Sequence, residues 1–245
     1  MTPDKLQQTL FIDIETVPQT EYFNQLPEEI QHLWEDKFTI LQKRMPEKYE
    51  DILRADRGYE TSAGIYAEFG KIVCISVGYI YFNGGIKQFR TKSFVSDNER
   101  LLLENFSLLV QQFFKTPEYT FCGHNIKEFD IPFICRRMLI NGLQLPPALQ
   151  IHNKKPWELN FIDTMDYWKF GDYKNFTSLK LLATIFEIPT PKDDIDGSQV
   201  ADVYYKEKNL ERISRYCEKD VVATAQVWLK MNNLSLIKSE NIHHV

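Results

Sequence analysis

Residues 71–95 carry the pattern that most constrains the fold of this chain. KIVCISVGYIYF, from Lys71 to Phe82, is rich in β-branched and aromatic residues, and Asn83-Gly84-Gly85 follows it. A turn sequence of this kind between two apolar runs is typical of a β-hairpin, with GIKQFRTKSFV as the second strand. The pattern therefore predicts an antiparallel pair of strands.

The segments around the hairpin alternate between strand and helix patterns. Further strands are predicted at 8–14, at 120–125 and in LNFIDTMDYW. One helix is predicted to follow a cap at Asp97, and another spans about 128–141 and ends at Gly142. The other predicted helices are at about 27–38, at 178–186, at about 200–208 and at 210–231. This order predicts an α/β fold with a mixed central sheet, whose antiparallel hairpin is flanked by helices. We expect one domain over residues 1–245, with an insert at about 19–64 that packs against its body.

Composition limits the class of protein. Of the 245 residues 43% are hydrophobic, so the chain can bury a substantial core. The net charge of -5 argues against a general nucleic-acid coat protein, but not against an enzyme with a local basic groove. The four cysteines lie far apart, which indicates a reducing compartment without disulfides. Because there is neither a signal-peptide pattern nor a run of ~20 apolar residues, we expect a cytoplasmic protein without a membrane partner.

The first strand carries two acids in FIDIETVP. Side chains two apart in a strand share a face, so Asp13 and Glu15 point the same way. Two neighbouring buried anions repel each other and lose hydration, and a pair of divalent ions between them would offset both costs. The alternative is a strand end with two solvated acids.

Further acids occur at two predicted helices. In GHNIKEFDIPFICRR, Asp130 stands at a helix start, where it could point toward a site or only complement the helix dipole. In RISRYCEKDVVATAQVWL, Tyr216 and Asp220 are four residues apart and share a helix face. The alternative for this second pair is an ordinary surface contact.

Taken together and in this order, these motifs resemble the DEDD superfamily of 3'-5' exonucleases, which have a ribonuclease H-like fold. The tyrosine is typical of the DEDDy branch. FIDIET, HNIKEFDIPF and YCEKDVVAT are most similar to the proofreading exonuclease domains of family B DNA polymerases. KPWE, IDTMDYWKFGDYKNFTSLKLLA and PKDDIDGSQV resemble a bacterial group of stand-alone predicted 3'-5' exonucleases related to that domain. The resemblance spans about residues 8–231.

The resemblance implies a catalytic role for five residues. Asp13, Glu15, Asp130 and Asp220 match the four metal-binding carboxylates, and Tyr216 matches a tyrosine that orients the attacking water. Four carboxylates can hold two Mg²⁺ or Mn²⁺ ions ~3.5–4 Å apart. Hard oxygen ligands suit those ions, and the lack of a His/Cys cluster in the sequence argues against zinc.

Several residues near these motifs are candidate substrate contacts. Thr16 is placed to reach a 3'-terminal hydroxyl, and Asn125 to bind the terminal nucleotide or hold a carboxylate. Phe129 would stack on the last base or only pack its helix, and Lys180 occupies a family position that faces the groove. Asp163 would orient Lys180 or a metal-bound water, or only cap a strand end, and His124 is interpreted as structural. The basic residues that could follow a phosphate backbone also include Arg136, Arg137, Lys169, Lys174 and Lys192.

The leading hypothesis is a metal-dependent 3'-5' exonuclease. It would act on single-stranded nucleic acid with a free 3' end, DNA rather than RNA, and release nucleoside 5'-monophosphates in repair, turnover or proofreading in trans. One alternative is an oligoribonuclease or RNA-trimming enzyme, since spacing does not report how a site treats a 2'-hydroxyl. Another is a catalytically silent nucleic-acid-binding protein on the same fold. A protein partner is not identifiable from the sequence.

Overall fold

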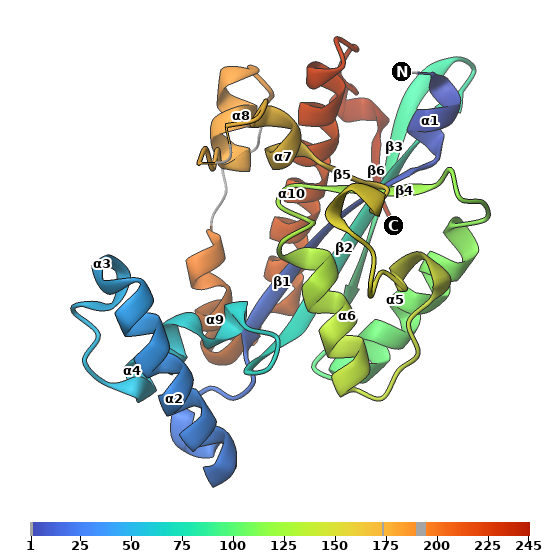
Figure 1. The fold of residues 1–245 in the computed structure, drawn as a ribbon. Coiled ribbons are helices and arrows are strands. Elements are labelled where there is room, and N and C mark those ends of the chain that lie inside the picture. Colours follow the sequence, from blue (N-terminus) through green and yellow to red (C-terminus); the bar gives the residue numbers. More distant parts are fainter. Residues whose placement is uncertain (1, 173, 190–194) are drawn as a thin grey trace.

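A mixed β-sheet lies at the centre of the computed structural model, which describes residues 2–172, 174–189 and 195–245 (Figure 1). Within these residues six strands follow the order β5-β4-β1-β2-β3-β6. They are β1 (Thr9–Pro18), β2 (Gly70–Asn83), β3 (Ile86–Val95), β4 (Thr120–Gly123), β5 (Phe161–Asp163) and β6 (Ile242–His244). The β1–β2 and β2–β3 pairs are antiparallel, and the other three pairs are parallel. The predicted α/β class with a mixed sheet is confirmed.

The β2–β3 hairpin closes where the sequence predicts it. Asn83 and Ile86 form the last pair, and Gly84 and Gly85 between them have φ angles of +56° and +79°. A two-residue turn needs this left-handed backbone at both positions, which glycine adopts without steric cost. At the other edge of β3, the strand β6 was not predicted, because a three-residue segment with two histidines has no apolar alternation.

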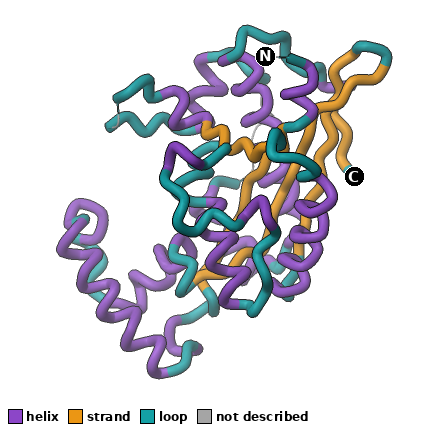
Figure 2. The backbone as a smooth tube through the Cα atoms, turned by 45° about the vertical axis from the view of Figure 1, so that its right-hand side comes forward, coloured by secondary structure: helices purple, strands orange, loops and turns teal. Residues whose placement is uncertain are grey.

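Helices cover both faces of the sheet (Figures 1 and 2). The α-helices are α1 (Pro3–Gln7), α2 (Glu28–Arg44), α3 (Pro46–Tyr49), α4 (Ala55–Ser62), α5 (Glu99–Phe113), α6 (Asp130–Ile140), α7 (Thr164–Trp168), α8 (Leu179–Ile185), α9 (Val200–Asp202) and α10 (Leu210–Met231). Short 3-10 turns join them, and a π-helical segment, Val203–Glu207, follows α9. None of the helices in the described residues is long and apolar enough to cross a membrane.

The alternation of β1 divides the core into two layers. Leu10, Ile12 and Ile14 belong to the hydrophobic cluster that contains the buried side chains of α5 and α6. Phe11 belongs to the cluster on the other face, together with Val221 of α10. This period of two places Asp13 and Glu15 on the face that α10 covers.

The helix boundaries follow local side-chain chemistry, with one correction. Asn98, not Asp97, caps α5, because its side chain accepts a hydrogen bond from the amide of Leu101. Ser178, one of two candidate caps with Thr177 at the predicted start of this helix, caps α8 in the same way. Gly142, at φ +68°, ends α6, since its amide donates to the carbonyl of Leu139.

The insert at 19–64 contains α2, α3 and α4 and has an aromatic cluster of its own. Trp34 lies at its centre, fully buried, and its Nε1 donates a 2.7 Å hydrogen bond to the carbonyl of Ala55. The Trp34 ring also contacts Phe69, which directly precedes β2, at a centroid distance of 5.1 Å. These contacts join the insert to the start of the second strand.

A buried ion pair joins α5, α6 and the segment before β2. Arg137 donates to both carboxylate oxygens of Glu99 and to the carbonyl of Ala67, and the amide of Ile72 donates to Glu99. The expectation that Arg137 could follow a phosphate backbone is therefore wrong, because its guanidinium is buried and committed to these partners. Its neighbour Arg136 is exposed.

Candidate functional site

An acidic cluster lies between β1 and α10. Glu15 is 8% exposed and Asp13 is half-buried, both on the face of β1 that α10 covers. Just after Glu15 the register of β1 and β2 shifts, so that Glu15 pairs with Cys74 but Thr16 pairs with Ile72. One extra residue, Val73, therefore makes a bulge in β2 beside the acids, as is common next to functional sites.

α10 contributes Tyr216 and Asp220 to this cluster. The negative charge of Asp220 raises the pKa of both Asp13 and Glu15, so the helix brings its acid close to the two acids on the strand. The pKa of Tyr216 is raised mainly by burial and then by the charge of Asp220, to which its hydroxyl is hydrogen-bonded. The phenol thus keeps its proton at any physiological pH.

Asp130 supplies the fourth carboxylate from the first turn of α6. It is 4% exposed, and burial raises its pKa to about 7, an effect that hydrogen bonds from the amides of Asp130 itself and of Ile14 partly offset. Ile14 stands between Asp13 and Glu15 in the sequence, so this bond brings the carboxylate of Asp130 to the same stretch of β1. The charge of Asp130 in turn raises the pKa of Asp13.

A bound cation would offset the repulsion between the carboxylates of this cluster. Burial, followed by the mutual repulsion of the acids, raises the pKa of Asp13 and Glu15 well above the usual range. Without a counter-charge, ionising all four carboxylates at neutral pH is costly. Oxygen donors of this kind suit a hard divalent ion such as Mg²⁺ or Mn²⁺, so the residues present fit a metal site.

A cysteine that the sequence did not assign to the site lies within it. The Sγ of Cys217 donates to Oδ2 of Asp13 at 3.3 Å and to its carbonyl oxygen at 3.4 Å. One ligand atom each from Asp13, Glu15 and Cys217 lie within 4.8 Å of one another. Sequence spacing gives no indication of this contact, because the sulfur comes from α10 and the oxygens from β1.

A groove of about 660 Å³ runs beside Glu15. Thr16 and Phe129, two of the predicted substrate contacts, line it, and the insert forms one wall through residues 60–65. Phe129 also packs on Phe133 at a centroid distance of 5.4 Å, so its ring serves both helix packing and the groove. The opposite wall comes from residues 197–202. The family resemblance of PKDDIDGSQV includes part of the second wall, whereas no sequence signal connected residues 60–65 with the acids.

The residues at the ends of β4 and β5 have largely structural roles. Asn125 adopts φ +66°, and its carbonyl accepts hydrogen bonds from the amides of Glu128 and Phe129. Asp163 caps α7, because its carboxylate accepts hydrogen bonds from the amides of Met165 and Asp166. It also accepts from the amides of Asn125 and Lys127, so it caps a strand end, which was one of the predicted alternatives. His124 joins Thr164 to the carbonyl of Thr177 and is structural, as predicted.

Within the described residues, no contact joins Lys180 to the acidic cluster. It lies exposed on α8, and its charge acts on Asp196, whose pKa it helps to lower. Lys192 and part of the PKDDIDGSQV segment lie outside the described residues.

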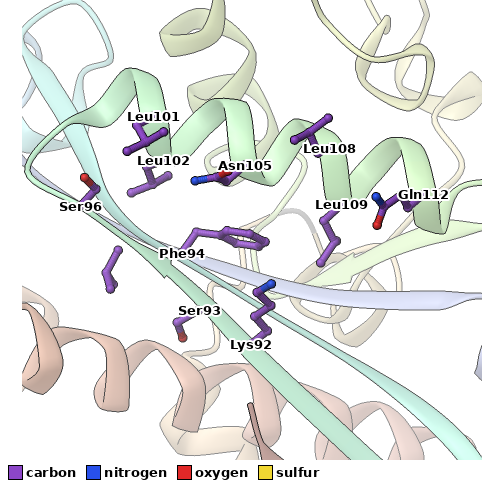
Figure 3. A pocket seen from close by; sticks show the side chains of 11 residues that line it. Lys92, Ser93, Phe94, Ser96, Leu101, Leu102, Asn105, Leu108, Leu109 and Gln112 are labelled. Atoms are coloured by element: carbon purple, nitrogen blue, oxygen red, sulfur yellow. The ribbon is translucent and has the colours of Figure 1, made fainter.

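A separate groove of about 530 Å³ between α5 and β3 holds one basic side chain, Lys92, and none of the four acids (Figure 3).

The mixed sheet, with acids from β1, α6 and α10, defines the class of ribonuclease H-like exonuclease folds. The chain belongs to the family of predicted 3'-5' exonucleases related to the exonuclease domain of PolB, whose model matches residues 65–241. This match includes Asp130, Tyr216 and Asp220, whereas β1 and the insert lie before it.

One solved structure with this fold is the family B DNA polymerase from the hyperthermophilic archaeon Pyrobaculum calidifontis. The two chains share 16% sequence identity at a TM-score of 0.54, and the alignment covers 91% of this chain. It covers only 24% of the polymerase, so this chain spans about a quarter of that protein's length. None of the curated proteins matches the sequence.

Proposed function

We propose that this protein is a metal-dependent 3'-5' exonuclease that hydrolyses the terminal phosphodiester of single-stranded DNA. The observation that carries the proposal is the gathering of four carboxylates at one stretch of β1: Asp13 and Glu15 share a face of the strand, Asp130 accepts from the amide of Ile14, and Asp220 on α10 is close enough for its charge to act on both strand acids. A catalytically silent protein would gain nothing from crowding four acids at one place, since their repulsion destabilises the fold. The family to which the chain belongs supports the same activity.

In this proposal, Asp13, Glu15, Asp130 and Asp220 hold two divalent ions, Mg²⁺ or Mn²⁺. When bound, these ions supply positive charge that stabilises the phosphoryl group and makes a water a better nucleophile. Tyr216 acts next to them. Its hydroxyl remains protonated and is held by Asp220, so it can orient a water toward the terminal phosphorus without becoming an anion.

The reaction exchanges one P–O bond for another, and one proton lost by the water is balanced by one gained by the leaving 3'-oxygen. The oxygen of water attacks the terminal phosphorus, the P–O3' bond breaks, and the shortened strand leaves with a 3'-hydroxyl. The other product is a nucleoside 5'-monophosphate. Thr16 and Phe129 line the groove beside Glu15, and in this proposal Thr16 binds the terminal sugar and Phe129 stacks on the last base.

Asn125 and Lys180 are the other two predicted substrate contacts. The half-buried side chain of Asn125 makes no hydrogen bond to any described residue, so its amide is available to a nucleotide. Lys180 would reach only a more distant phosphate, because it lies exposed on α8 beside Asp196. A preference for DNA over RNA, a role in repair and a cytoplasmic location remain predictions from the sequence.

Single-stranded DNA and RNA of the same sequence, each labelled at the 5' or the 3' end, test the proposal. We expect a ladder of shortened 5'-labelled strands and an immediate labelled monophosphate from 3'-labelled strands, both only with Mg²⁺ or Mn²⁺. Comparison of the two sugars decides between the DNA enzyme and the RNA-trimming alternative. Cleavage that persists in EDTA, or that Asp13→Asn leaves intact, would contradict the mechanism.

A further inference from the structure

Cys217 places a sulfur atom inside the acidic cluster. Its side chain is fully buried, and its Sγ lies 3.3 Å from Oδ2 of Asp13. The helix fixes this position, because Cys217 packs in the same hydrophobic cluster as Val73 and Cys74 of β2. The packed core thus holds the sulfur next to the carboxylate.

Glu15 provides a second and independent indication of a ligand. Its side chain is 92% buried, yet it makes no hydrogen bond or ion pair with any described residue. Its carboxylate is directed into the group formed with Asp13 and Cys217, where the three ligand atoms lie within 4.8 Å. Two carboxylates this close together repel each other, and a bound cation would offset that repulsion.

The spacing of these atoms fits an ion that binds sulfur and oxygen together. Tetrahedral zinc, with bonds of ~2.3 Å to sulfur and ~2.0–2.2 Å to oxygen, separates the two donor atoms by about 3.5 Å. The measured Cys217–Asp13 separation is 3.3 Å. An oxygen of Glu15 lies within 4.8 Å of both atoms, and a shift of its side chain toward them would complete the site.

We propose that Asp13, Glu15 and Cys217 form a binding site for one thiophilic divalent cation, such as Zn²⁺ or Cd²⁺, which inhibits the enzyme. The cation bonds to Sγ and to one oxygen of each carboxylate, and the thiol proton leaves to solvent. Since Asp13 and Glu15 cannot serve this ion and the ions of catalysis at once, its binding stops hydrolysis. This regulation rests on the proposed function, but the binding site itself does not.

Cd²⁺ binding, measured without nucleic acid, tests the site directly. Cd²⁺ is titrated into the full chain, and the ultraviolet charge-transfer band of a sulfur–cadmium bond is recorded. We expect one equivalent to produce the band in the wild type and in Cys135→Ser, a matched control whose thiol lies on α6, and we expect no band in Cys217→Ser. Asp13→Asn keeps the sulfur and loses one oxygen ligand, so its Cd²⁺ affinity should fall at least about tenfold.

The same variants report on inhibition. Zn²⁺ added to Mg²⁺-supported hydrolysis should inhibit the wild type at least about tenfold more strongly than Cys217→Ser, each relative to its own uninhibited rate. A band that survives in Cys217→Ser, a wild type without a band, or an unchanged Cd²⁺ affinity in Asp13→Asn would overturn the proposed site. A Cys217-dependent band in a protein that hydrolyses no nucleic acid would support the site and overturn the proposed function.

Discussion

The hydroxyl of Ser93 on β3 donates a 2.6 Å hydrogen bond to Oε1 of Glu218 on α10. The other carboxylate oxygen of Glu218 lies 2.6 Å from Nδ1 of His244 on β6, and Ser93 also bonds to Ser76 at 2.7 Å. Ser76 pairs with Asp13 in the sheet. A row of polar side chains thus connects the acidic cluster with the last strand and fixes α10 over the sheet.

Glu218 should consequently act as a positioning residue. Glu218→Ala removes the partner of Ser93, so we expect a loss of about 1–3 kcal/mol in the free energy of unfolding. Because Tyr216 and Asp220 lie on the same helix, the turnover number should fall more than the Michaelis constant changes. Denaturant unfolding and steady-state hydrolysis measure the two effects. Glu211→Ala, which removes an exposed residue of the same helix, is the control and should change neither.

Asp13→Asn should stabilise the metal-free protein while it abolishes hydrolysis. The neutral amide removes one charge from a cluster in which burial and then neighbouring acids raise the pKa of Asp13. At pH 8 in EDTA we expect the free energy of unfolding to rise by about 1 kcal/mol or more, since one pKa unit corresponds to ~1.4 kcal/mol. Denaturant titration checks this, and a less stable Asp13→Asn protein would show that the acids do not repel one another.

The stability of the metal-free protein should fall as the pH rises from about 4 to about 7. Carboxyl groups ionise near pH 4 in the unfolded chain, whereas Asp130 in the folded protein ionises at about 7. In that window the folded state binds more protons, so each rise in pH favours unfolding. Mn²⁺ should counteract this, with a larger gain in melting temperature at pH 8 than at pH 5. An equal gain at both pH values would exclude the cluster as the binding site.

Arg136 and Arg137 are neighbours with opposite predicted phenotypes. Arg137→Ala leaves Glu99 buried without its charge partner, so we expect the unfolding free energy to fall by about 3–5 kcal/mol. Arg136→Ala removes an exposed charge and should leave stability within about 0.5 kcal/mol. Chemical denaturation of both variants compares them directly. Equal stability of the two would mean that the Glu99–Arg137 pair does not stabilise the fold.

Phe129→Ala should weaken substrate binding more than it slows the chemical step. Loss of a ring that lines the groove removes base stacking, worth about 1–3 kcal/mol, and should lower kcat/KM by about 5- to 150-fold on single strands. Leu139→Ala, at an exposed position of the same helix, is the control. Because Phe129 also packs on Phe133, unfolding midpoints are needed beside the kinetics. A normal KM in a folded Phe129→Ala protein would mean that Phe129 contributes to helix packing and not to substrate binding.

Local patterns predicted much of this fold, and long-range pairings set the rest. The Asn83-Gly84-Gly85 turn and the cap at Ser178 depend on neighbouring residues, so the sequence shows them directly. β6 and the contact of Cys217 with Asp13 join residues more than 150 positions apart, which no local period reports. That residues 1–245 form one domain stays a prediction.

Mn²⁺ binding, followed by electron paramagnetic resonance, tests the central claim most directly: that four carboxylates from β1, α6 and α10 hold two divalent ions together. We expect two bound ions per chain in the wild type, and fewer or much more weakly bound ions in each of Asp13→Asn, Glu15→Gln, Asp130→Asn and Asp220→Asn. Two tightly bound ions in all four variants, or none in the wild type, would contradict it.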